Sequence, residues 1–232
     1  MMPAELFSAV KELIRKEVHN LNFVTPDHFW PDIQALCAAL RNEGIKIPKI
    51  FNGSGYQLPE LVQDYAKEMD IFMPDFKFAE PALAKLCMGD EQYPEIASNA
   101  IKEMVRSKGL LDPWDPTGEV PAQKGVLVRH LVLPGHVENS LKVLRSLHQA
   151  FGPGIPVSIM SKFCPVPGCS GKGAFERSLR AEEYEKVLGL VKELGFERVY
   201  VQELVEQTAF LPDFQDPEDP FQGNKDRVKN DG

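Results

Sequence analysis

Short apolar or β-branched runs alternate along the chain with longer stretches of helical periodicity, and this alternation is its strongest pattern. Between these runs, apolar residues recur about every 3.6 positions, as on the buried face of an amphipathic helix. The pattern predicts βα units, and therefore an α/β fold with parallel strands in an open or closed barrel. Six runs have the length of buried strands, at 21–24, 49–52, 71–74, 126–133, 156–160 and 198–202.

The expected helices lie at 3–18, 31–42, 59–66, within 81–108, between His136 and Gly152, and at 181–194. Gly44 and Gly195 follow two of them, where a left-handed C-cap suits glycine. The segment LLDPWDPTGEVPAQKG, at 110–125, is too rich in proline, glycine and aspartate to predict a regular element. From Pro212 the chain is polar and contains further prolines, so we expect one domain at 1–211 and a disordered tail at 212–232.

Composition narrows the class of protein. The 232 residues, 43% apolar and 26% charged, suffice to bury a core. A net charge of −8 without any cluster of Lys and Arg argues against a nucleic-acid partner. The most apolar stretch, at 125–134, is interrupted by Arg129 and His130, so no membrane span is expected. The amphipathic start contains acidic residues and fits neither a secretory signal nor a transit peptide, so we expect a cytoplasmic protein.

Four cysteines, Cys37, Cys87, Cys164 and Cys169, are too few and too scattered for a disulfide-rich secreted scaffold, which favours reduced thiols. Cys164 and Cys169 are separated by four residues, whereas zinc ribbons use a two-residue gap, and no other Cys or His lies close in sequence. We therefore assign no metal ligand. The sequence also lacks G-x-G-x-x-G, P-loop, G-x-S-x-G and H-E-x-x-H motifs, so it offers no common dinucleotide, nucleotide, hydrolase or zinc-protease site.

Polar residues at the C-terminal ends of the expected strands are the first candidates for function, because parallel barrels carry their reacting groups there. Asp75 and Lys77 are two residues apart, so in extended chain they face the same side and could present a carboxylate and an ammonium to a zwitterionic ligand. A local ion pair at a sheet end is the alternative. The turn Asn52-Gly53-Ser54-Gly55 allows backbone to approach a ribose or amino-acid group, but it fits a ligand-free connection equally well.

Arg129 and His130 are adjacent within one expected strand, so they point to opposite faces and only one can face a barrel interior. A lone histidine in a strand is more often a hydrogen-bonded core residue than a catalyst. His136 could cap the following helix as readily as it could touch a substrate. The residues by themselves leave the function open.

Six segments match one family pattern in order and spacing. They are HNLNFVTPDHF at 19–29, KIFNGSGY at 49–56, DIFMPDFKF at 70–78, VLVRHLVLPGH at 126–136, VSIMSKFCP at 157–165 and VYVQEL at 199–204. Together they make the chain, from about Leu6 to Asp213, resemble the radical S-adenosylmethionine (radical SAM) proteins related to pyruvate formate-lyase-activating enzyme.

The resemblance implies a partial (β/α) barrel in which S-adenosylmethionine lies across the strand C-terminal ends beside a 4Fe–4S cluster. In that family the cluster cleaves the cofactor reductively to a 5′-deoxyadenosyl radical, which abstracts a hydrogen atom. A glycyl radical enzyme as protein substrate, and flavodoxin or ferredoxin as reductant, are implied in the same way. By position the resemblance assigns eight residues to the cofactor: Asn52, Ser54 and Gly55 near the ribose, Asp75 and Lys77 near the ribose or methionine moiety, Arg129 and His130, and Met160 bordering the adenosine or substrate side.

The family's C-x3-C-x2-C loop, which holds the cluster, and its Gly-Gly-Glu turn are absent from this sequence. Both belong to the first two βα units of the family, and the chain begins at what resembles the helix before the third strand. We therefore expect the C-terminal two-thirds of such an enzyme, inactive alone because none of its cysteines matches the missing ligands. One alternative is a non-catalytic module that binds S-adenosylmethionine and complements a separate cluster-bearing chain. Another is a different barrel enzyme that uses Asp75, Lys77 and His130 as acid–base groups.

Overall fold

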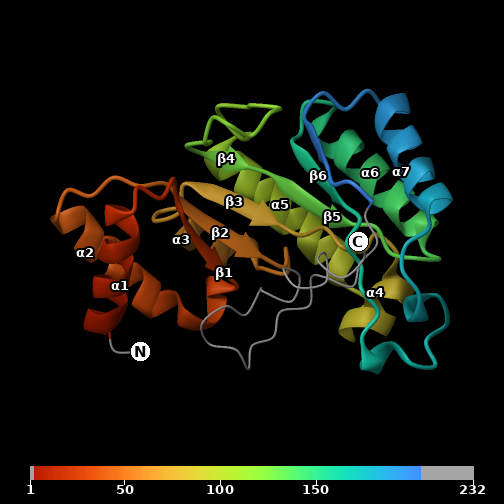
Figure 1. Ribbon diagram of the computed structural model, residues 1–232, viewed down its shortest axis with the longest axis horizontal. Coiled ribbons are helices and arrows are strands. Elements are labelled where there is room, and N and C mark those ends of the chain that lie inside the picture. The colour runs from red at the N-terminus through yellow and green to blue at the C-terminus, as the bar shows by residue number, and fades with distance from the viewer. Residues whose placement is uncertain (1–2, 205–232) are drawn as a thin grey trace, which may run out of the picture.

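The computed structural model describes residues 3–204, which form an α/β fold with two parallel sheets (Figure 1). The first sheet has the order β1 (Leu21–Val24), β2 (Lys49–Gly53), β3 (Ile71–Pro74), β4 (Gly125–Val126), and the second has the order β5 (Val128–Leu131), β6 (Val157–Met160), β7 (Val199–Val201). Every strand pair is parallel and neighbouring strands follow in chain order. The predicted α/β class with parallel strands is confirmed.

One predicted strand, at 126–133, is divided into β4 and β5 because its hydrogen-bonding partner changes at Leu127. The Leu127 amide donates to the Phe72 carbonyl of β3, whereas the next amide, of Val128, donates to the Pro156 carbonyl just before β6. Beyond this point an isolated parallel bridge joins Asp75 to Arg129, so the end of β3 remains beside β5. The two sheets thus continue one into the other.

The helices cover one face of these sheets. Side chains from α2 through α7 share a single core cluster with the strand residues Phe51, Phe72, Val128 and Ile159, and Figure 1 shows α3 and α5 behind the strands. Helix α1 packs in a smaller cluster against α2 and β1. The bounds are α1 (Pro3–Arg15), α2 (Trp30–Asn42), α3 (Pro59–Tyr65), α4 (Pro81–Met88), α5 (Tyr93–Lys108), α6 (Val137–Phe151) and α7 (Ala181–Glu193).

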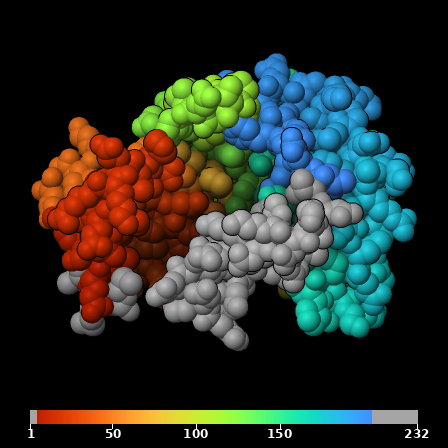
Figure 2. All heavy atoms as spheres, viewed as in Figure 1, coloured from red at the N-terminus to blue at the C-terminus, as the bar shows by residue number. Residues whose placement is uncertain are grey.

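Residues 110–124, here called the linker, lie on the face of the sheets opposite the helices and cover the N-terminal part of the strands there. Leu111 is buried against Ile71 and Leu127, and the Trp114 ring lies 4.5 Å from that of Tyr200 on β7. Figure 2 looks onto this face, which is hollowed between the N-terminal part of the chain and β7, with the linker along its upper margin. Residues 110–124 form no helix or named strand, and the linker is held instead by apolar contacts with this face.

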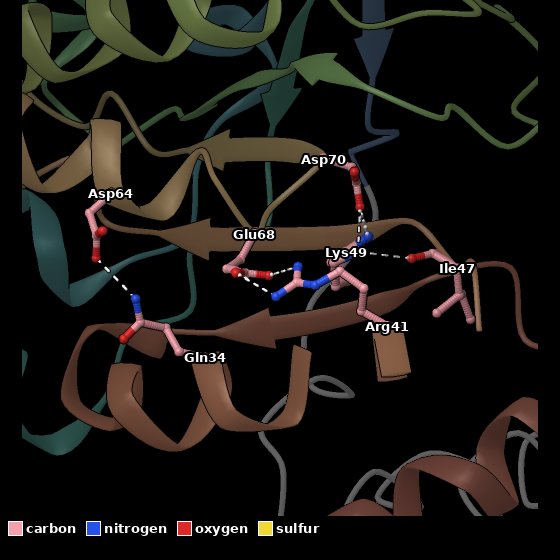
Figure 3. Close-up of polar contacts among 7 residues, drawn as sticks. All are labelled: Gln34, Arg41, Ile47, Lys49, Asp64, Glu68 and Asp70. Atoms are coloured by element: carbon pink, nitrogen blue, oxygen red, sulfur yellow. Dashed lines mark hydrogen bonds and ion pairs between the residues drawn. The ribbon is translucent and has the colours of Figure 1, made fainter. Parts of the chain in front are cut away.

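Ion pairs fix the N-terminal ends of β2 and β3 (Figure 3). Arg41 of α2 donates two hydrogen bonds to Glu68, at 2.8 and 3.2 Å. The Lys49 ammonium lies 3.0 Å from Asp70, whose carboxylate also accepts the Lys49 amide at 2.9 Å. A cavity of about 410 Å³ lies among these residues. Lys49 and Asp70 line it as a pair, Arg41 is neutralised by Glu68, and Lys46 has no ion pair among residues 3–204. Because the cavity lies at the strand ends opposite to those where parallel α/β folds react, we assign it a structural role.

No helix within residues 3–204 is long and apolar enough to cross a membrane. The predicted tail at 212–232 lies outside the described residues.

Candidate functional site

Four neighbouring strands place one row of side chains on the face opposite the helices. Asp75 pairs in register with Arg129, Arg129 with Ser158, and Ser158 with Tyr200. Because side chains alternate along a strand, all four point to the same side of the sheet. Tyr200 belongs to the apolar layer that the linker covers, and the other three residues stand just beyond that layer. Asp75 follows the C-terminal end of β3, where the sequence predicts polar groups, whereas Arg129, Ser158 and Tyr200 are each the second residue of their strand.

The centre of this row is a three-residue charge cluster. Arg129 Nη2 lies 2.7 Å from Asp75 Oδ1, and Lys77 Nζ lies 3.3 Å from Asp75 Oδ2. The Asp75 side chain is only 14% exposed and that of Arg129 20%. The Arg129–Asp75 contact is an ion pair that lacks hydrogen-bond alignment, so Asp75 Oδ1 and Arg129 Nε are buried atoms with no hydrogen bond to residues 3–204. Two cations beside one carboxylate leave a net positive charge and a donor that an anionic group would satisfy.

Tyr93, at the start of α5, holds the ends of β2 and β3 together. Its buried hydroxyl accepts the Lys77 amide hydrogen at 3.0 Å. The same oxygen lies 2.9 Å from the Ser54 carbonyl and 3.0 Å from the Asp75 carbonyl, which share its single hydrogen. Burial raises the pKa of Tyr93, so the hydroxyl keeps that hydrogen at neutral pH. One side chain thus joins the turn after β2 to the backbone of Asp75 and Lys77.

Gly55 allows the turn after β2 to touch the end of β3. Its φ is +77°, and a Cβ built there would overlap the carbonyl oxygen of Asp75. Only glycine combines that backbone conformation with so close an approach. Asn52 lies beside Met73 in the strand register, on the same face as Asp75. The turn therefore lies against the backbone of Asp75, and its contact with a ligand stays a prediction.

Two buried residues of α6 hold the backbone that follows Asp75. The Asn139 amide donates to the Lys77 carbonyl at 2.9 Å and accepts the Ala79 amide at 2.8 Å. Ser140 Oγ lies 2.9 Å from His130 Nε2, and His130 Nδ1 lies 2.7 Å from the Phe76 carbonyl oxygen. A carbonyl can only accept, so His130 carries its hydrogen on Nδ1, and Nε2 accepts from the serine hydroxyl.

The predicted site residues have two different outcomes. Six of them lie near or just beyond the C-terminal ends of β2, β3 and β6: Asn52, Ser54, Gly55, Asp75, Lys77 and Met160. Arg129 is the second residue of β5, in register with Asp75. His130 faces the helices, is buried, and has both ring nitrogens bonded to protein groups. This placement disfavours cofactor contact or acid–base chemistry by His130, because its neighbour Arg129 occupies the open face.

Sequence reasoning missed several residues that shape the site. Ser158 could have been found, because it lies two positions before Met160 and so shares its face. Tyr93 and Asn139 gave no local signal. They act from helices 18 and 62 residues away from the groups that they hold.

The cysteines do not fit an iron–sulfur cluster. Cys37 is buried in α2, Cys87 lies on α4, and Cys164 and Cys169 lie in the segment after β6. Burial raises the pKa of Cys37 to about 11, which opposes the thiolate that a cluster requires. Within residues 3–204 no three His, Cys, Asp or Glu side chains are grouped to hold a metal ion.

No protein-family profile matches this chain. An uncharacterised protein of the archaeon Methanocaldococcus jannaschii is 22% identical over 198 residues, which are 85% of this chain and 53% of that protein. The chain thus spans about half the length of the relative that it matches. This likeness assigns neither a family nor an activity.

Proposed function

We propose that this chain is the cofactor-binding part of a radical SAM protein of the activating-enzyme type, and that S-adenosylmethionine binds across the C-terminal edge of the sheets. The observation that carries the proposal is the cluster of Asp75, Lys77 and Arg129 on the face opposite the helices, with the buried Arg129 Nε unsatisfied by residues 3–204. Chain-order parallel strands with helices on one face support a partial (β/α) barrel.

The groups on this face suit the parts of S-adenosylmethionine. Lys77 and Arg129 would bind the α-carboxylate, and Asp75 would attract the α-ammonium or the sulfonium. The side chains of Asn52 and Ser158 would hydrogen-bond the ribose hydroxyls, while Met160 offers apolar contact to adenine. When bound, the cofactor would supply a sulfonium centre for reductive cleavage. Because the cysteines do not fit a cluster, we expect these 232 residues to bind the cofactor without cleaving it.

Calorimetric titration of S-adenosylmethionine into the purified chain tests the proposal. Arg129→Gln removes a charged donor and should weaken binding by about tenfold or more, since charge-assisted hydrogen bonds contribute roughly 1.5–3 kcal/mol. Arg145→Gln removes the same charge from an exposed position on α6 and should leave binding unchanged. Thermal unfolding of both variants controls for folding. Absence of binding by the unaltered chain, or equal binding by Arg129→Gln, would refute the proposal.

A second candidate is a non-catalytic module that complements a separate cluster-bearing chain. It is favoured by the outer edge of β1, which has no partner strand within residues 3–204. Val24, the last residue of that edge strand, is 69% exposed, and Phe29, at the end of the 3-10 helix that follows it, is 64% exposed. An unpaired strand edge of this kind can accept a further strand. For the assembly with the cluster-bearing chain, we further propose a glycyl radical enzyme as substrate, flavodoxin or ferredoxin as reductant, and a cytoplasmic location. We do not propose them for these 232 residues alone.

Anaerobic reconstitution with iron and sulfide distinguishes the two candidates. The module predicts cluster absorbance only when the chain is mixed with the product of a neighbouring gene that carries the cysteine motif. The absence of that absorbance in the mixture would count against complementation.

A further inference from the structure

A cavity of about 330 Å³ lies next to the charge cluster, between α4 and the segment after β6. Its walls are mainly apolar and include Leu131, Leu133, Phe163 and Phe175. The rings of Phe163 and Phe175 lie 5.8 Å apart, so the segment after β6 folds back on itself at this side of the cavity. This volume is at the lower end of the range for small-molecule pockets.

The charged groups that line this cavity are both cationic. Lys77 lines it from the end of β3, and Lys172 lines it from the segment after β6. No carboxylate is among the lining residues that lie within the described part of the chain. Lys77 is partly neutralised by Asp75 at 3.3 Å, whereas Lys172 has no ion pair within residues 3–204. An apolar cavity with unbalanced positive charge at its rim complements an anion that carries a hydrocarbon body.

We propose that this cavity binds a small organic anion, with its carboxylate or phosphate head at Lys172 and Lys77 and its apolar body against the leucine and phenylalanine walls. The head needs the lysines, because moving a charge against an apolar wall without a partner is costly. The body contributes through the apolar area that it removes from water. The binding itself does not depend on S-adenosylmethionine. Lys77 belongs to both sites, so the anion would lie next to the proposed cofactor site.

Two thiols that line the cavity report its occupancy. Cys87 and Cys169 both face it, whereas Cys164, in the same segment as Cys169, does not line it. The rates of N-ethylmaleimide alkylation can be followed separately at the three residues by mass spectrometry of peptides. Octanoate, kept below its micelle concentration, is the probe. Octyl phosphate tests the alternative head, octanol tests the body without charge, and acetate tests the charge without body.

Octanoate or octyl phosphate at saturation should slow alkylation of Cys87 and Cys169 at least fivefold and leave Cys164 unchanged. The more effective of the two identifies the head group. Octanol and acetate at the same concentration should have little effect. Equal protection by octanol, protection of all three thiols alike, or no protection by either anion would overturn the assignment.

Lys172→Gln should weaken octanoate binding, measured by thiol protection, about threefold to fivefold, the upper part of the range for an exposed ion pair. Lys102→Gln, on the exposed surface of α5, is the matched control and should change nothing. Equal octanoate affinity in Lys172→Gln and the unaltered chain would contradict a role for this lysine. If the unaltered chain binds S-adenosylmethionine but octanoate does not protect its thiols, only the proposal of an anion cavity is refuted. If octanoate protects the thiols but S-adenosylmethionine does not bind, only the proposed function is refuted.

Discussion

Acidification should destabilise this protein through His130, and the effect can be separated from that of the carboxyl groups. His130 is buried with both ring nitrogens occupied: Nδ1 donates to the Phe76 carbonyl and Nε2 accepts from Ser140. A second ring proton would face the Ser140 oxygen in an apolar site. Burial, the largest cause, therefore lowers the pKa of His130 from 6.5 to about 4.

The size and sign of the effect follow from this pKa difference. The unfolded chain takes up the imidazole proton near pH 6.5, whereas the folded protein resists it until about pH 4. The unfolded state therefore binds more protons between these values, so stability is intact above pH 6.5 and falls as the pH drops toward 4. At about 1.4 kcal/mol per pKa unit, the loss amounts to about 3 kcal/mol.

Urea unfolding at several pH values between 7.5 and 4, followed by far-ultraviolet circular dichroism, measures this loss. His130→Gln is the reference, because an amide can also donate to Phe76 and accept from Ser140 but does not titrate. Carboxyl groups contribute equally to both proteins and cancel in the difference. The unaltered chain should lose about 3 kcal/mol more than the variant. Parallel stability curves for the two proteins would refute the reasoning.

Two further substitutions test the backbone arrangement around Asp75. Gly55→Ala should cost about 2–4 kcal/mol and weaken S-adenosylmethionine binding, because the new methyl group overlaps the Asp75 carbonyl. Gly44→Ala, also at positive φ but with nothing within 4 Å, should cost only about 1 kcal/mol, and equal losses would contradict the overlap. Tyr93→Phe removes the hydroxyl that hydrogen-bonds three backbone groups and leaves those groups without this partner. It should lower the unfolding free energy by about 1–3 kcal/mol. Tyr56→Phe, at an exposed hydroxyl bonded to Asp90, should stay within about 0.5 kcal/mol, so similar losses in both variants would exclude the proposed role of Tyr93.

The sequence alone determined the elements and the common face of two residues of the charge cluster. Apolar runs separated by segments of helical periodicity predicted the strand bounds to within one or two residues at most ends. This is possible because hydrophobic periodicity and the glycines and prolines that end an element are local features of the sequence. The spacing of Asp75 and Lys77 likewise fixed their common face, and the structure places them 3.3 Å apart in an ion pair.

Tertiary structure decided which of the predicted residues belong together. The orientation of Arg129 and His130 depends on which face the helices cover, and strand alternation alone leaves both choices open. The linker packs on the apolar face of the sheets that lies opposite the helices. The residues of that face come from other parts of the chain, so the linker sequence alone does not reveal the contact. Tyr93 and Asn139 reach the site from distant helices, so only the packed chain brings their hydrogen bonds to the backbone around Asp75. Local periodicity therefore specified the elements, whereas long-range packing specified the site, because its supporting contacts join residues far apart in the chain.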